Sequence, residues 1–248
     1  GTTTMDALTS GACNIAMGVN AYGTAAAGAN NVAIGNTAMG GSLVTGANNI
    51  ALGTNAADAL LAGACNVAIG ESALSSVSTG NSNVAIGQKA FRDATTGTAN
   101  IAIGHEAMMD GIVTGNNNIG MGNQALAALT SGACNIAIGV APLQSATIGL
   151  YNIAIGKSAM AGVTTGQADN NIAIGLDAIK GHSTMSGNVN IGIGRFALDA
   201  LTSGACNIAL GQNSLGAATT GNQNIAMGEC AMGVGVTTGA SNIAIGNH

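Results

Sequence analysis

Charge, aromatic residues and proline are all scarce in this sequence. Charged residues make up 6% of the chain and aromatic residues 2%, and Pro142 is the only proline. Five Lys and Arg residues stand against ten Asp and Glu, so the net charge is −5 and no basic patch is available for nucleic acid or an anionic membrane. No stretch of about 18 residues is free of Asn, Gly and Thr, which argues against membrane insertion.

Apolar residues and glycine are abundant instead. Apolar residues make up 47% of the chain, and its 40 glycines do not follow the Gly-X-Y triplet of collagen. Disordered chains combine low hydrophobicity with high charge, and this sequence has the reverse. We therefore expect the chain to fold.

A pentapeptide of the form Asn-Ile-Ala-Ile-Gly, as at residues 135–139, recurs along the whole chain. Successive copies begin 17, 18 or 19 residues apart, and repeats of this length indicate stacked structural units. The fourteen copies begin at Asn14, Asn31, Asn49, Asn66, Asn83, Asn100, Asn118, Asn135, Asn152, Asn171, Asn190, Asn207, Asn224 and Asn242.

Each repeat can be numbered from its Asn as position 0. Positions +1 and +3 are always large and aliphatic, +2 is Ala or Gly, and +4 is always Gly. This alternation predicts a β-strand whose +1 and +3 side chains point into the core, with Gly at a corner that needs positive φ or a close backbone approach. We expect the core to include the large residue at +8 and an apolar residue at +11 or +12, such as Leu43, Leu60 or Ile112.

A unit with one short strand cannot bury its own apolar face, so the repeats are expected to stack. The sequence predicts an all-β fold, a parallel β-solenoid or β-roll of about 14 rungs, as one domain over residues 1–248. At ~4.8 Å between strands the stack would be about 65 Å long. A helical repeat is excluded because the glycines at +4 and −3 would interrupt every helix. We expect the chain to be a segment of a longer protein.

The small residue at +2 is predicted to mark a self-association face. If the +1 and +3 side chains fill the core, +2 points away from it, and a water-facing position should vary. We therefore expect another copy of the chain against this face, although a tightly folded roll in which +2 meets its own chain is the alternative. The predicted face comprises Ala16, Ala33, Ala51, Ala68, Ala85, Ala102, Gly120, Ala137, Ala154, Ala173, Gly192, Ala209, Ala226 and Ala244.

The Asn residues at position 0 are expected to form a ladder in which each side-chain amide bonds to the rungs above and below. No carboxylate column accompanies them, which argues against a row of calcium sites. Four cysteines stand just before the Asn, and we interpret them as small buried residues, with a cross-chain bond or a metal as the alternatives. These are Cys13, Cys65, Cys134 and Cys206.

No catalytic, cofactor or metal site emerges from the sequence, and we do not expect an enzyme. His105, Glu106 and Asp110 could form an acid/base cluster, but all three occupy variable positions that we expect at the surface.

The repeat N-I-A-I-G-x-x-A-L, followed by T-T-G or T-S-G, resembles the Ala/Gly-rich repeats of phage tail fibres. It is also similar to the head repeats of trimeric autotransporter adhesins, which have a shorter period and Asn one position earlier. Asn30, Asn48, Asn117 and Asn170 match that position, whereas the four cysteines depart from it. The resemblance implies a homotrimeric β-roll or solenoid in an extended fibre.

Three functions are compatible with these observations. The first is a structural and adhesive segment of a virion tail fibre, which would contact other fibre or virion proteins and support attachment to a host receptor. The second is the head of a bacterial surface adhesin, located outside the cell. The third is an ice-binding solenoid, but its usual T-x-T row is missing from the strands.

Overall fold

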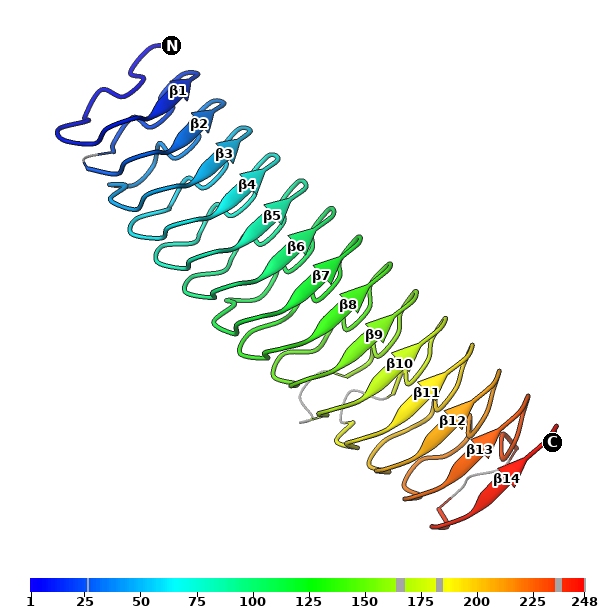
Figure 1. Ribbon diagram of the computed structural model, residues 1–248. Coiled ribbons are helices and arrows are strands. Elements are labelled where there is room, and N and C mark those ends of the chain that lie inside the picture. The colour runs from blue at the N-terminus through cyan, green and yellow to red at the C-terminus, as the bar shows by residue number, and fades with distance from the viewer. Residues whose placement is uncertain (26, 164–167, 182–184, 235–237, 248) are drawn as a thin grey trace. The chain divides into compact units, whose positions relative to one another are not determined.

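A computed structural model describes residues 1–25, 27–163, 168–181, 185–234 and 238–247 of the chain. All regular secondary structure in these ranges is β-strand, and each turn of the chain contributes one strand of three residues (Figure 1). The described part of the chain contains no helix with the length and apolar character that a membrane span needs.

The strands coincide with the predicted ones, since each covers positions +1 to +3 of a repeat and ends before the Gly at +4. They are β1 (Ile15–Met17), β2 (Val32–Ile34), β3 (Ile50–Leu52), β4 (Val67–Ile69), β5 (Val84–Ile86), β6 (Ile101–Ile103), β7 (Ile119–Met121), β8 (Ile136–Ile138), β9 (Ile153–Ile155), β10 (Ile172–Ile174), β11 (Ile191–Ile193), β12 (Ile208–Leu210), β13 (Ile225–Met227) and β14 (Ile243–Ile245).

The chain divides into two compact units, residues 1–124 with β1 to β7 and residues 125–248 with β8 to β14. Within each unit consecutive strands pair in parallel and in register, so that Ala68 of β4, for example, lies between Ala51 and Ala85. Each unit is therefore a parallel β-solenoid, and the predicted fold class is confirmed at this level.

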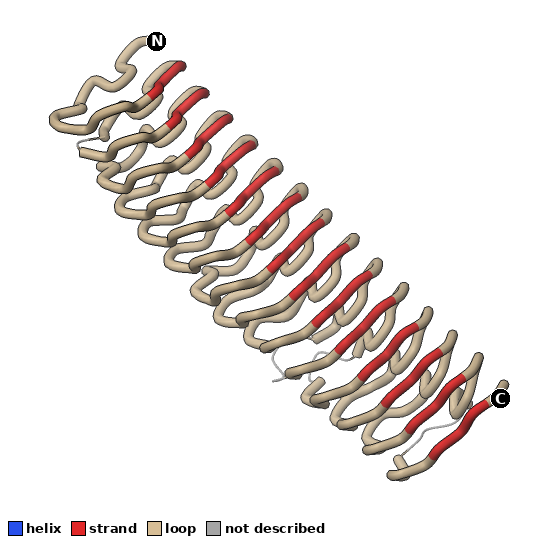
Figure 2. The backbone as a smooth tube through the Cα atoms, in the orientation of Figure 1, coloured by secondary structure: helices blue, strands red, loops and turns tan. Residues whose placement is uncertain are grey.

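Loops that turn through left-handed residues make up the rest of each rung (Figure 2). Non-glycine residues at −1, +6 and +8 have φ between 44° and 62°, and the Gly at +4 has φ between 128° and 138°. Such residues are normally uncommon because the left-handed region costs an L-residue roughly 1–2 kcal/mol. Here the stack stabilises them: the amides of Asn30, Thr37 and Met39 each donate to a carbonyl of a neighbouring rung at 2.9 Å.

The prediction for the two strand faces is wrong. The residue at +2 lies inside the solenoid and is buried in every rung except the terminal ones, where Ala16 and Ala244 are partly exposed. The +1 and +3 side chains point outward. The predicted self-association face of alanines is therefore part of the chain's own core, which is the alternative of a tightly folded roll.

The narrow interior explains why a methyl group fits at +2 and an isoleucine does not. The large +8 side chains, such as Leu74, Phe91 and Met108, are completely buried and fill the rung from the opposite wall. At Gly192, an added Cβ would lie 2.7 Å from Cγ1 of Ile179, the +8 residue of the preceding rung. The +8 side chain therefore occupies the space that a larger +2 residue would need.

The predicted core residue near +11 or +12 is confirmed in part. Leu60, Val77 and Leu129 are buried, but Leu43 and Ile112 are exposed. Both exposed residues belong to 18-residue repeats, in which the extra residue shifts the next side chain, Val44 or Val113, into the core.

Candidate functional site

The Asn residues at position 0 form a hydrogen-bonded column inside each unit. In each step of the column, the Oδ1 atom of one Asn accepts from the backbone N–H of the next at 2.8 to 3.0 Å. In eleven steps the same oxygen also accepts from the next side-chain amide at 2.9 to 3.3 Å. The column runs from Asn14 to Asn118 and from Asn135 to Asn242.

A third bond explains why Asn alone suits this position. The Nδ2 of Asn66 donates to Oδ1 of Asn49 at 3.1 Å and to the carbonyl of Gly80 in the next rung at 2.9 Å. Oδ1 of Asn66 in turn accepts two bonds from Asn83. Both donors and both acceptor positions of a fully buried amide are thus used, which is what burial of a polar group requires.

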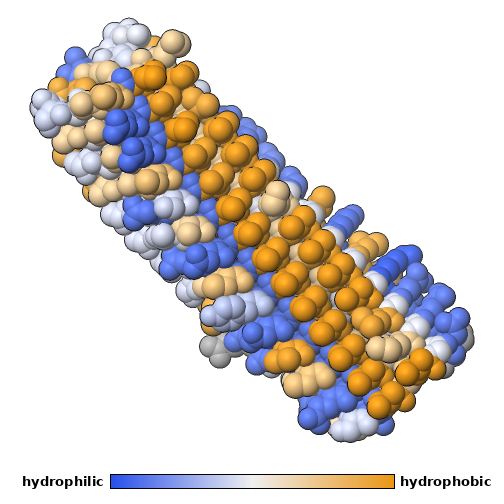
Figure 3. All heavy atoms as spheres, viewed as in Figure 1, coloured by the Kyte–Doolittle hydropathy of each residue, from blue (hydrophilic) through white to orange (hydrophobic). Residues whose placement is uncertain are grey.

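The outward face of the strands is an apolar surface, which we call the strand face and define as positions +1 and +3 of β1 to β14. It carries only Ile, Val, Leu and Met. In Figure 3 these side chains form adjoining rows of hydrophobic residues over the strands of each unit. The outward residues of interior rungs are half-buried to exposed: those of β4, β5 and β6 are half-buried, and Ile50 and Ile193 are 38% and 39% exposed.

The cysteines before the Asn are not buried, which corrects the sequence interpretation. Cys13, Cys65 and Cys206 are exposed and Cys134 is half-buried, and all four are free thiols. The reason is the left-handed backbone at −1, with φ of 59° or 60° at these cysteines, which turns the side chain out of the rung. Cys65 lies three rungs from Cys13, about 14 Å by strand spacing, so they cannot form a disulfide with each other.

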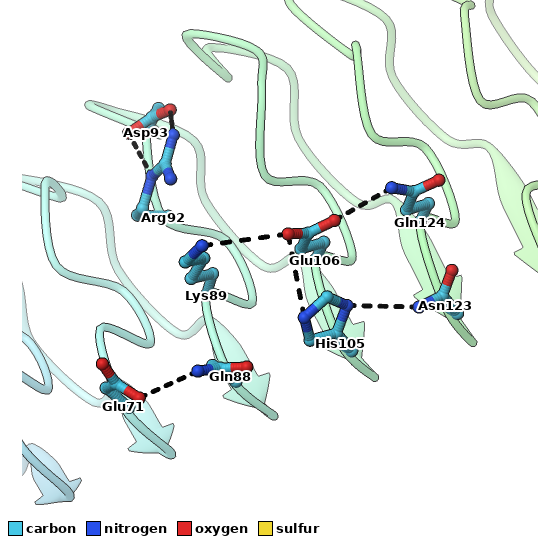
Figure 4. Close-up of polar contacts among 9 residues, drawn as sticks. All are labelled: Glu71, Gln88, Lys89, Arg92, Asp93, His105, Glu106, Asn123 and Gln124. Carbon is cyan, nitrogen blue, oxygen red and sulfur yellow. Dashed lines mark hydrogen bonds and ion pairs between the residues drawn. The ribbon is translucent and has the colours of Figure 1, made fainter.

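A polar cluster covers the corner after the strands in residues 1–124 (Figure 4). Identical positions in neighbouring rungs pair: Gln88 donates to Glu71 at 2.8 Å, and Gln124 donates to Glu106 at 2.9 Å. Lys89 lies 3.9 Å from Glu106, and Arg92 makes a bidentate pair with its neighbour Asp93. Surface pairs of this kind contribute little to stability.

The acid/base candidate of the sequence lies within this cluster. Nε2 of His105 is 3.7 Å from Oε1 of Glu106, so the structure brings these two together. The hydrogen bond from Gln124 is the largest cause of a lowered pKa at Glu106; desolvation partly offsets it, and the nearby His105, Lys89 and Arg92 lower the pKa further, which favours the ionised, paired carboxylate. The pKa of Arg92 is raised, mainly by its hydrogen bond to Asp93. The negative charge of Asp110 makes a smaller contribution in the same direction.

Within the described residues, no three His, Cys, Asp or Glu side chains are grouped so that they could hold a metal ion, and no pocket is found. The strand face is therefore the most distinctive surface of the molecule. Comparison of the chain with models of known protein families and with curated proteins found no match.

Proposed function

We propose that this chain is a structural segment of a virion tail fibre that assembles as a homotrimer and supports attachment to a host surface. The observation that carries the proposal is the in-register stack in each unit, in which every rung bonds to its neighbours through backbone and Asn side chain alike. Stacks of this kind transmit load along the strand-to-strand direction, because their hydrogen bonds are aligned with it. In this proposal, the chain carries out no catalytic step and binds no cofactor.

The outward apolar surface supports the assembly of several copies. Soluble monomers rarely expose contiguous apolar patches larger than a few hundred Å², and larger ones mark interaction sites. The resemblance of the repeat to those of phage tail fibres supports the choice of a virion fibre and of three copies. The binding of other fibre proteins and of a host receptor is part of the same proposal.

Sedimentation equilibrium combined with solution scattering tests the proposal. The proposal predicts a mass three times that of the 23.6 kDa chain and an elongated particle. A compact monomer would contradict it. Receptor attachment is tested separately, by binding of the labelled assembly to candidate host cells, where no retention would remove the adhesive part of the proposal.

The head of a bacterial surface adhesin is the alternative, because the same repeat and the same stack suit it. The sequence that flanks this segment distinguishes the two. A coiled-coil stalk with a membrane anchor would favour the adhesin, and a tail-attachment domain would favour the virion fibre. Ice binding is less favoured, since the outward strand positions, where a regular array would meet ice, are aliphatic rather than Thr.

A further inference from the structure

Two kinds of outward position can be compared in this molecule, the corner at +5 and the strand face at +1 and +3. Position +5, at the corner just beyond the strand, is polar or charged in eleven of the fourteen repeats, as at Glu71, His105 and Lys157, and is Val or Leu in the other three. The strand face also points outward, yet neither of its two positions is polar in any of the fourteen strands. The fold itself does not demand this, because the interior is already filled by the +2, +7 and +8 side chains.

We propose that the strand face is the surface through which copies of this chain contact one another. This inference rests on the self-association included in the proposed function and assigns it to particular residues. It replaces the alanines at +2, which the chain's own core already covers.

The repeat period identifies a second copy as the occupant. The rows of Ile, Val, Leu and Met are spaced by one strand, ~4.8 Å, and only a partner with the same spacing can interdigitate over seven consecutive strands. Another copy has that spacing by construction. Parallel copies can place the β-branched +1 column of one chain against the +3 column of the next, a contact that closes into a ring when repeated around a symmetry axis.

The area and the charge distribution are consistent with this occupant. Seven strands of three residues give each unit a strand face of about 340 Å² in flat projection, roughly two-fifths of the ~800 Å² that each partner contributes to a standard interface. Every charged residue lies outside the strands, and the residues at −1 along the neighbouring edge are all uncharged. Identical copies with a net charge of −5 can therefore meet here without placing like charges face to face.

Paired lysine substitutions test the proposal. The strand-face variant is Leu52→Lys with Ile86→Lys, and the matched control is Thr54→Lys with Gln88→Lys, at exposed +5 positions of the same two rungs. Lys157 occupies +5 naturally, so the control residue is compatible with the fold. Sedimentation equilibrium of the full chain measures assembly, and circular dichroism with thermal melting measures folding.

We expect the strand-face variant to remain folded, because a lysine stem can lie along the strand with its ammonium in water. Its dissociation constant should rise by at least about 100-fold, since assembly would bury unpaired charges. The control should assemble like the unmodified chain. If the lysine variant does not fold, Leu52→Thr with Ile86→Thr places a β-branched side chain, which strands favour, at both positions and should weaken assembly in the same direction.

Two outcomes overturn the inference, and they differ in what they say about the proposed function. A folded strand-face variant, with lysine or threonine, that assembles as tightly as the control would show that copies meet elsewhere, while self-association itself would stand. An unmodified chain that stays monomeric at high concentration would remove self-association and this inference together. In that case, binding of the monomer to neutral phosphatidylcholine vesicles would assign the face to a lipid surface instead.

Discussion

The two faces of each strand accept different kinds of variation. The inward face has Asn at position 0 and Ala or Gly at +2 in all fourteen rungs, whereas on the outward face +1 varies between Ile and Val and +3 among Ile, Leu and Met. The inward positions are constrained atom by atom, through the amide column and the lack of space beside the +8 side chain. The outward positions are constrained to be large and apolar, and at +1 also β-branched, as expected of a surface that another apolar surface covers.

The largest loss of stability is expected when one amide of the Asn column is replaced by a carboxylate. Asn66→Asp would remove the two amide donations to Asn49 and Gly80 and bury a carboxylate against their oxygens. An uncompensated buried charge costs about 3–5 kcal/mol, so we expect strong destabilisation in chemical denaturation.

Asn81→Asp is the matched control. Oδ1 of Asn81 accepts a hydrogen bond from the backbone amide of Ala64, and a carboxylate oxygen can accept the same bond. Asp169 makes the equivalent bond to Leu150 in another rung at 2.8 Å, so the fold already accepts Asp at this position. Equal stability of the two variants would mean that the column is not essential for the fold.

Ala154→Leu should have a smaller but clear effect, since it forces three extra carbons into the space that +8 side chains fill. Overpacking of this kind costs about 1–3 kcal/mol, whereas Ile155→Leu, the outward neighbour, should leave monomer stability nearly unchanged. Thermal melting of both variants is the measurement. A greater loss for Ile155→Leu would reverse the assignment of the two faces.

The smallest change in stability is expected at Asp58, whose carboxyl group is partly buried. Oδ1 of Asp58 is buried without a hydrogen-bond partner among the described residues, and desolvation raises the pKa of this carboxyl while the amide of Gly41 partly offsets the shift. A raised folded-state pKa means that the stabilising contribution is complete below the ordinary Asp pKa and is lost as the pH rises through the raised value.

Asp58→Asn should therefore increase stability at pH 7 by at most about 1 kcal/mol, and this gain should disappear near pH 3, roughly below the ordinary Asp pKa. The exposed Asp6→Asn is the control and should show neither effect. Melting curves at the two pH values decide, and a gain of equal size at both would exclude the charge as its cause.

The sequence predicts the strands, their register and the position of the Asn column, because a period of 17 to 19 residues leaves one way to stack identical units. It cannot decide which face of the strand is inside. Alternation shows only which residues share a face, and the usual rule that large apolar residues are buried fails here because the +8 side chain fills the rung first. The left-handed backbone at −1, +6 and +8 is equally hard to predict from the sequence. At −1, residues as different as Tyr151, Val189 and Cys206 all have φ between 57° and 60°.

The methionines of the native sequence offer the most direct test of the central claim, that +3 points outward and +8 inward. Met17, Met121 and Met227 stand at +3 and are 65%, 38% and 37% exposed, whereas Met39, Met108 and Met160 stand at +8 and are fully buried. Peroxide oxidises accessible methionine sulfur, and peptide mass spectrometry measures the rate at each position. In the folded, monomeric strand-face variant, we expect the +3 methionines to oxidise well before the +8 methionines; faster oxidation at +8 would contradict the account.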